Sequence, residues 1–262
     1  MTAQFGPHRF SAGEYDSDHT DQYRGANFTV HDLTGSRFVD CDLTDVKIVD
    51  GVLVNVDISG YVQHLVVNGI DVTDYVSTEL HRRHPERARL GELRGADDFK
   101  ALWSTVEDLW SGTIKRAERL PEEVRHERVD GEWSIAETLR HLIFITDAWV
   151  SRTVLDEPRP YHPIGLPQSW YPQADAAALG IDVNAAPTWT EVLEALDSRR
   201  AVVRTIMVDL KDADLGRLCD RPPAPGYPEG DRPVAECLAV LLEEEIEHHR
   251  YAVRDLQALE AR

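Results

Sequence analysis

The sequence predicts a mixed two-domain protein, in which a short repeat-built coil is followed by an all-α four-helix bundle. Two observations support this prediction: large apolar side chains recur at every fifth position near the start of the chain, and four long amphipathic stretches follow. The length of 262 residues is sufficient for both parts and for a sizeable core. We expect domains at residues 1–75 and 96–262, joined by a helical linker at residues 76–95.

Composition and charge narrow the classes of function. A net charge of -19 argues against general binding to nucleic acids or anionic membranes. Residues 1–9 lack the basic start and apolar core of a secretion signal, and no apolar run is long enough for a transmembrane helix. The 3 cysteines are odd in number and widely spaced, which is typical of a reducing compartment. We therefore expect a cytoplasmic protein.

The five-residue period lies in the first 60 residues, and it matches neither a helix nor a strand. Two positions before most of the large residues lies a small one, although His31 departs from this rule. The pattern resembles the pentapeptide-repeat family, whose members form a right-handed β-helix of square cross-section, and implies about two turns of that fold here. The large residues are Tyr23, Phe28, Leu33, Phe38, Leu43, Ile48, Leu53 and Ile58.

The repeat block suggests a structural or interface role. Residues 1–75 contain 12 acidic and 4 basic side chains, so mimicry of DNA by an acidic surface is an alternative. Beyond the repeats, residues 61–72 predict two strands around an Asn68-Gly69 turn. A short helix is expected at Thr73–His84, and the charged segment Pro85–Gly95 has no pattern.

Four helices are predicted after residue 96 from apolar periodicity and capping signals. The first follows Asp97 or Asp98 and ends before Pro121. The second and third open with capping boxes, Ser134 with Glu137 and Thr188 with Glu191, and reach about residues 155 and 210. The fourth starts near residue 233. Two long connections, residues 156–186 and 211–230, are rich in proline, and the first is expected to line a binding site.

The last helix carries the strongest chemical signal. Its apolar stripe runs into Glu245 and His249, which are four residues apart and therefore share one face. A carboxylate and an imidazole at this spacing can bind one metal ion. Two alternatives remain: Glu244 and His248 on a face that borders solvent, or a wholly solvated charged helix.

A third ligand is available on the second predicted helix. His141 lies midway along that helix, as Glu245 and His249 do along the fourth. If the two helices face each other, three ligands converge and leave a position open for water or substrate, as in catalytic zinc sites. Nickel, iron or manganese would also suit this mixed set of nitrogen and oxygen ligands.

Two motifs resemble the DinB-like superfamily, over about residues 97–262. Residues 132–142 read Glu-Trp-Ser-Ile-Ala-Glu-Thr-Leu-Arg-His-Leu, and residues 245–250 read Glu-Ile-Glu-His-His-Arg. The resemblance implies a four-helix bundle with a divalent metal held by His141, Glu245 and His249. A glutamate as the middle ligand is similar to the branch of mycothiol-dependent maleylpyruvate isomerases.

The resemblance implies a metal-dependent thiol S-transferase or isomerase acting on a small electrophile with a mycothiol-like thiol as cosubstrate. In the first long connection, Arg159, Tyr161, Trp170 and Tyr171, together with His162, are expected to bind cosubstrate and substrate, and Arg159 would meet a carboxylate. The alternatives are a metal-assisted hydrolase and a non-catalytic protein that binds partners through the acidic repeats. A homodimer is also expected, because the repeat edges are exposed.

Overall fold

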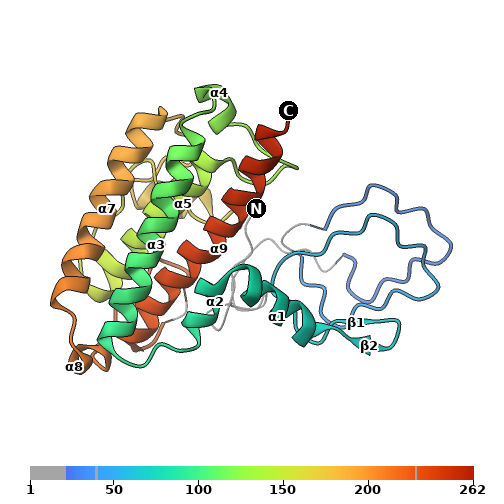
Figure 1. The fold of residues 1–262 in the computed structure, drawn as a ribbon, viewed down its shortest axis with the longest axis horizontal. Coiled ribbons are helices and arrows are strands. Elements are labelled where there is room, and N and C mark those ends of the chain that lie inside the picture. The colour runs from blue at the N-terminus through green and yellow to red at the C-terminus, as the bar shows by residue number, and fades with distance from the viewer. Residues whose placement is uncertain (1–21, 39–40, 228) are drawn as a thin grey trace.

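The computed structural model describes residues 22–38, 41–227 and 229–262 and is mostly helical (Figure 1). No helix in these ranges is long and apolar enough to cross a membrane. The elements in chain order are β1 (Val66–Val67), β2 (Ile70–Asp71), α1 (Thr73–Arg83), α2 (Pro85–Leu90), α3 (Ala96–Ala117), α4 (Glu122–Arg125), α5 (Ile135–Ile145), the π-helix η1 (Thr146–Val154), α6 (Gln173–Ala178), α7 (Trp189–Asp209), α8 (Asp212–Leu215), β3 (Leu218–Cys219), β4 (Arg232–Pro233) and α9 (Val234–Glu260).

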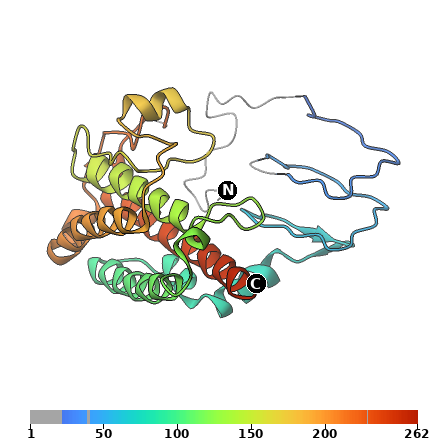
Figure 2. The ribbon, with the colours of Figure 1, turned by 90° about the horizontal axis from the view of Figure 1, so that it is seen from above.

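Four long helical segments form the predicted bundle, so that part of the fold prediction is confirmed. Helix α9 packs against α3 on one side and against α5 and η1 on the other, and α7 completes the ring by contacting α3, α5 and η1. Figure 2 shows α9 running between α3 and α5. The largest fully buried side chains are Trp110, Trp149, Phe144, Leu102, Leu139, Leu142, Ile143, Ile145, Leu238, Leu241, Leu242 and Ile246.

The helix starts follow the capping chemistry of the sequence. At α5 the Ser134 hydroxyl accepts the Glu137 N–H at 3.2 Å, and the Glu137 carboxylate accepts the Ser134 N–H at 2.9 Å. Thr188 and Glu191 form the same reciprocal pair before α7. Each pair satisfies backbone donors that a helix N-terminus leaves free, typically stabilising the helix by about 1 kcal/mol.

The β-helix expected for residues 1–75 is not present in the described part of that segment. The strands there are β1 and β2, of two residues each, which pair as a hairpin around Asn68 and Gly69, both with positive φ. The five-residue period instead appears in the backbone angles, because a left-handed residue occurs at every fifth position on either side of residues 39 and 40, which lie outside the described ranges. These residues are Gly25, Val30, Gly35, Asp45, Asp50, Asn55 and Gly60.

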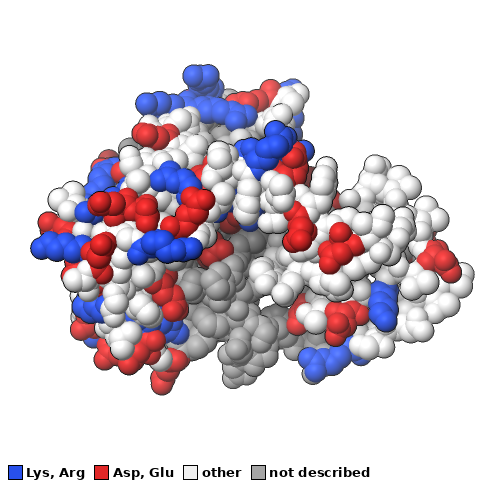
Figure 3. All heavy atoms as spheres, turned by 60° about the horizontal axis from the view of Figure 1, so that its bottom comes forward, with Lys and Arg blue, Asp and Glu red and all other residues white. Residues whose placement is uncertain are grey.

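The backbone hydrogen bonds of these repeats are local. The Ala26 N–H donates to the Tyr23 carbonyl and the Ser36 N–H to the Leu33 carbonyl, which closes turns within one repeat, and residues 22–38 and 41–60 contain no paired strands. The result is a turn-rich coil beside the bundle, which we call the N-terminal coil (residues 22–38 and 41–60). Charged side chains are sparser over this side of the molecule than over the bundle in Figure 3.

The segment without a sequence pattern, residues 85–95, contains helix α2. Pro85 occupies the first helical position, where its missing N–H costs nothing. Helix α2 packs on α9, and Arg87 forms a salt bridge with Glu247, whose side chain is only 2% exposed. This short helix therefore buries the face of α9 that carries Glu247.

Helix η1 buries a carboxylate outside the predicted site. Asp147 is 1% exposed and lies 2.8 Å from Arg199 Nε on α7, while its other oxygen accepts the His162 N–H at 2.7 Å. Burial raises the pKa of Asp147 to about 6, against the opposing effect of the Arg199 guanidinium. The π-helical geometry of η1 therefore coincides with a buried ion pair between two helices of the bundle.

We expect the stability contribution of Asp147 to fall as the pH rises. The folded protein holds this proton up to about pH 6, whereas the unfolded chain releases it near pH 4. The contribution is thus complete below pH 4 and lost as the pH passes 6. Relative to Asp147→Asn, the parent should lose roughly 2–3 kcal/mol of unfolding free energy between pH 4 and 7.

Urea unfolding of both proteins across this pH range measures the difference directly. The control is Asp97→Asn, at a fully exposed side chain. Its unfolding free energy should change with pH in the same way as that of the parent. If the unfolding free energy of Asp147→Asn also changes with pH as that of the parent does, Asp147 is ionised in the folded protein throughout this range.

Candidate metal centre

Three buried side chains from two helices converge at one point of the bundle. His141 comes from α5, and Glu244 and His248 come from successive turns of α9. One ligand atom of each lies within 4.8 Å of the other two. Glu244 Oε2 is 3.0 Å from His248 Nε2 and 3.5 Å from His141 Nε2. The exposed fractions of the three residues are 1%, 7% and 1%, so the group is almost completely shielded from water.

The first long connection fixes the orientation of the His141 ring. His141 Nδ1 lies 2.8 Å from the Leu166 carbonyl oxygen, and a carbonyl can only accept, so Nδ1 carries the proton. Nε2 is then left with a free lone pair directed toward Glu244. A hydrogen bond from the non-coordinating nitrogen to a carbonyl is the usual way in which proteins orient a metal-binding histidine.

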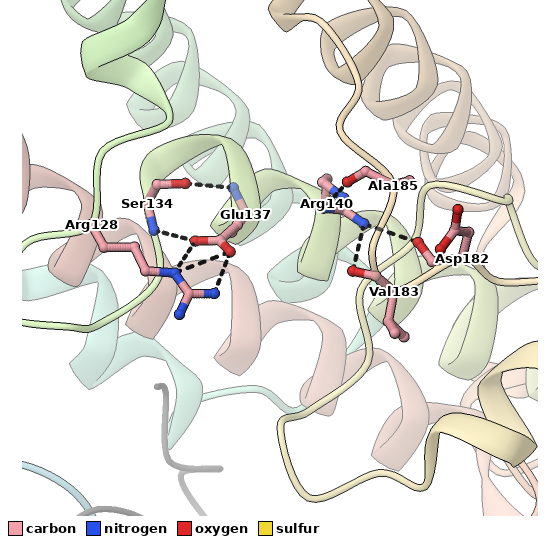
Figure 4. A network of polar contacts seen from close by, with 7 residues as sticks. All are labelled: Arg128, Ser134, Glu137, Arg140, Asp182, Val183 and Ala185. Atoms are coloured by element: carbon pink, nitrogen blue, oxygen red, sulfur yellow. Dashed lines mark hydrogen bonds and ion pairs between the residues drawn. The ribbon is translucent and has the colours of Figure 1, made fainter.

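Arg140 ties that connection to α5. Its buried guanidinium donates to the carbonyl oxygens of Asp182, Val183 and Ala185, as Figure 4 shows, and to that of Ile164 at 2.8 Å. The Leu166 N–H in turn donates to the Arg140 carbonyl at 3.1 Å. The loop that orients His141 is therefore anchored by the residue immediately before it.

The charge state of the cluster suits a cation. Burial alone would raise the pKa of Glu244, but the neighbouring imidazoles of His248 and His141 outweigh it and lower this pKa. Burial lowers the pKa of His248, so an ionised carboxylate lies beside a neutral imidazole. Trp133 covers both rings, with its centroid 4.8 Å from that of His141 and 6.2 Å from that of His248. A carboxylate buried without a compensating cation is costly.

The donor geometry also fits a divalent ion. Ligand atoms about 2.0–2.1 Å from a tetrahedral zinc lie about 3.3–3.4 Å apart. The two distances from Glu244 Oε2 to the imidazole nitrogens, 3.0 and 3.5 Å, bracket that value. Two nitrogens and one oxygen form the mixed set that zinc and other first-row divalent metals accept. His141, Glu244 and His248 could therefore hold a metal ion.

The predicted partners of His141 differ from these by one residue. Glu245 and His249 lie on another face of α9, toward α3 and α7. The Glu245 carboxylate is 3.5 Å from Arg200 Nη2, and His249 Nε2 is 2.8 Å from Thr113 Oγ1. The structure thus brings His141 together with Glu244 and His248, the alternative pair of the sequence analysis, and not with Glu245 and His249. Which pair binds a metal ion with His141 stays a prediction.

The physical reason is that α9 is buried on almost every face. Every residue from Glu244 to His249 is buried, because α2, α3, α5 and η1 all pack around this stretch. An apolar stripe identifies the inward face only for a helix with one wet side. The same i, i+4 spacing at Glu244 and His248 was only an alternative in the sequence analysis, and the anchor Arg140 was missed.

The loop residues predicted to bind ligand divide into two groups. Tyr161 and Tyr171 pack against Phe144, whose ring lies 6.3 Å from that of His141. Trp170 packs on Tyr171. Arg159 is exposed. Three of the four residues thus belong to an aromatic cluster one ring away from His141, and their role in binding stays a prediction.

The fold and this site define a class: a helical-bundle protein with a buried His-Glu-His group able to bind a metal. Comparison with protein families agrees, because the DinB superfamily matches residues 105–252, more than half of the chain. The protein belongs to the DinB superfamily. The comparisons with curated proteins and with solved structures gave no match.

Proposed function

We propose that this protein is a metal-dependent thiol S-transferase or isomerase, which acts on a small electrophile with a low-molecular-weight thiol such as mycothiol. The observation that supports the proposal is the buried group of His141, Glu244 and His248 in a chain of the DinB superfamily. When bound, a divalent ion supplies a Lewis acid that favours the thiolate form of a thiol. The three side chains would hold this ion.

The chain's own residues provide the surroundings that such chemistry needs. The Leu166 carbonyl holds His141 with its Nε2 toward Glu244. Trp133 stacks on the His248 ring, lies tilted against the His141 ring, and covers one side of both imidazoles. The aromatic side chains of Phe144, Tyr161 and Tyr171 offer apolar surface beside His141 for an unsaturated substrate.

The reacting thiol is assigned to a cosubstrate because two of the three cysteines are poor nucleophiles. Cys219 and Cys237 are both buried, and burial raises the pKa of each thiol, that of Cys237 to about 12. The thiolate, not the thiol, is the nucleophile. Cys41 is exposed, but it belongs to the N-terminal coil.

The test is turnover of α,β-unsaturated keto acids by protein reconstituted with zinc, nickel, manganese or iron(II). We expect conversion only when metal and thiol are both present, and a loss of at least about a hundredfold after chelation or in His141→Ala, because the ion is lost. Arg140→Lys, which keeps the ligands but weakens the loop anchor, should retain metal.

Two results would point to another function. Conversion of the substrate at the same rate without thiol would favour a metal-assisted hydrolase. If no thiol supports turnover in protein that holds its metal, the transferase proposal fails, and a non-catalytic role for the chain becomes the better interpretation.

A further inference from the structure

Two of the three cysteines lie together although they come from different elements. Cys219 is the second residue of β3, and Cys237 lies in the first turn of α9. Strand β3 pairs with β4 so that Cys219 lies opposite Arg232. Just beyond this pair, the Val234 N–H donates to the Arg217 carbonyl at 2.9 Å, which holds β3 against the start of α9. In this arrangement the Cys237 thiol hydrogen-bonds the Cys219 sulfur.

This thiol pair has no part in the proposed reaction. Both side chains are almost completely buried, with exposed fractions of 4% for Cys219 and 0% for Cys237. Neither belongs to the group of His141, Glu244 and His248. The third cysteine, Cys41, is exposed on the N-terminal coil. The chemistry open to two adjacent thiols is therefore available to this pair.

The two sulfurs differ in their surroundings. Burial raises the pKa of both thiols, that of Cys237 to about 12, so each forms its thiolate reluctantly. At Cys219 two neighbours oppose the effect of burial. Arg217 Nη1 donates to Cys219 Sγ at 3.7 Å, and the Cys237 S–H donates to the same sulfur. Cys219 is therefore the sulfur that reacts first with an oxidant.

We propose that Cys219 and Cys237 are a reversible oxidation site, where hydrogen peroxide converts the two thiols into a disulfide between β3 and α9. The Cys219 thiolate attacks one peroxide oxygen, the O–O bond breaks, and one water leaves while the sulfur becomes a sulfenic acid. The Cys237 sulfur then attacks the Cys219 sulfur, the S–O bond breaks, and a second water leaves with the thiol proton. Two thiols are thus oxidised while one peroxide is reduced to two waters.

The disulfide would fasten the second long connection, residues 211–230, to the helix that carries Glu244 and His248. This connection already bonds the first one, because the Tyr161 hydroxyl donates to the Pro223 carbonyl and the Tyr227 hydroxyl donates to Gln168 Oε1 at 2.8 Å. A covalent ring from Cys219 to Cys237 also restricts the unfolded chain. The oxidised protein is therefore the more stable form.

Intact-mass measurement of Cys41→Ser, before and after treatment with hydrogen peroxide, tests the proposal. We expect the loss of two hydrogens, about 2 Da, which dithiothreitol reverses, and a disulfide between Cys219 and Cys237 in the peptide map. The melting temperature should rise by at least about 5 °C on oxidation, because the ring is closed. The matched control is Cys41→Ser/Cys219→Ser, which should show neither the loss of mass nor the rise.

A second measurement removes any dependence on how slowly an oxidant reaches the buried sulfurs. After Cys41→Ser has equilibrated with oxidised glutathione overnight, thiol titration in urea should find at least about tenfold less free thiol than in the reduced protein. Two thiols that remain free after this treatment would overturn the proposal. Addition of oxygen atoms or of glutathione in place of the loss of two hydrogens would also overturn it, because the sulfurs would then react separately.

Discussion

Glu244→Gln is expected to remove divalent metal from the purified protein, whereas Glu245→Gln should retain it. The first change takes a charged ligand from the group of His141, Glu244 and His248, and we expect affinity to fall by at least about a hundredfold. The second change alters the carboxylate that faces Arg200 on another side of α9. Metal content by mass spectrometry after reconstitution with each metal distinguishes the two positions.

Variants of the two histidines test independently which residues of α9 bind the metal ion. His248→Ala should lose the metal, while His249→Ala should keep it, because His249 bonds Thr113 and packs on the Trp110 ring. Circular dichroism and normalisation to folded protein separate ligand loss from unfolding. Retention of metal in Glu244→Gln and His248→Ala, with loss in the Glu245 and His249 variants, would restore the register predicted from the sequence.

The bundle could be predicted from the sequence because its signals are local. Capping boxes at Ser134 and Thr188 and the apolar periodicity of α3 determine where helices begin and which residues they bury, and the structure has these helices close to the predicted bounds. His141 was found in the same way, since it lies midway along a well-defined helix.

The register of the site could not be predicted because it depends on what packs around α9. Helix α2 has no apolar pattern of its own, yet Arg87 pairs with Glu247 and covers a side of α9. Arg140 was missed for a related reason. Its partners are backbone carbonyls of residues 164 and 182–185, and backbone groups give no signal in a sequence.

For the N-terminal coil, the sequence pattern is visible in the structure but the predicted fold is not. Its five-residue period in the sequence reappears in the positions of the left-handed residues, but not as the strands that the family resemblance implied. Strand formation depends on pairing between distant repeats, which a local pattern does not determine. The period of the sequence therefore coincides with the spacing of the left-handed residues, whereas the β-helix predicted from it is not present in the described residues.

Arg200→Met should destabilise the protein by up to about 3–5 kcal/mol, the cost of leaving a buried charge without its partner, and by less at a pH where Glu245 takes up a proton, because burial raises the pKa of this carboxyl. The Glu245 side chain is 1% exposed, and its carboxylate lies 3.5 Å from the guanidinium of Arg200, which also lies over the Trp110 ring. The other carboxylate oxygen, Glu245 Oε1, has no hydrogen-bond partner among the described residues. Urea unfolding at neutral pH measures the loss.

The double variant Arg200→Met/Glu245→Leu tests whether the unpaired charge is the cause. With both charges replaced by apolar groups of similar volume, most of the lost stability should return, because the desolvation cost of the carboxylate disappears with it. Arg204→Met is the control, since its pairs with Glu107 and Asp197 involve a half-exposed guanidinium and contribute at most about 1 kcal/mol. A double variant as unstable as Arg200→Met would assign the loss to packing around Trp110. Metal retained by the double variant would show that this ion pair stabilises the bundle without taking part in the metal site.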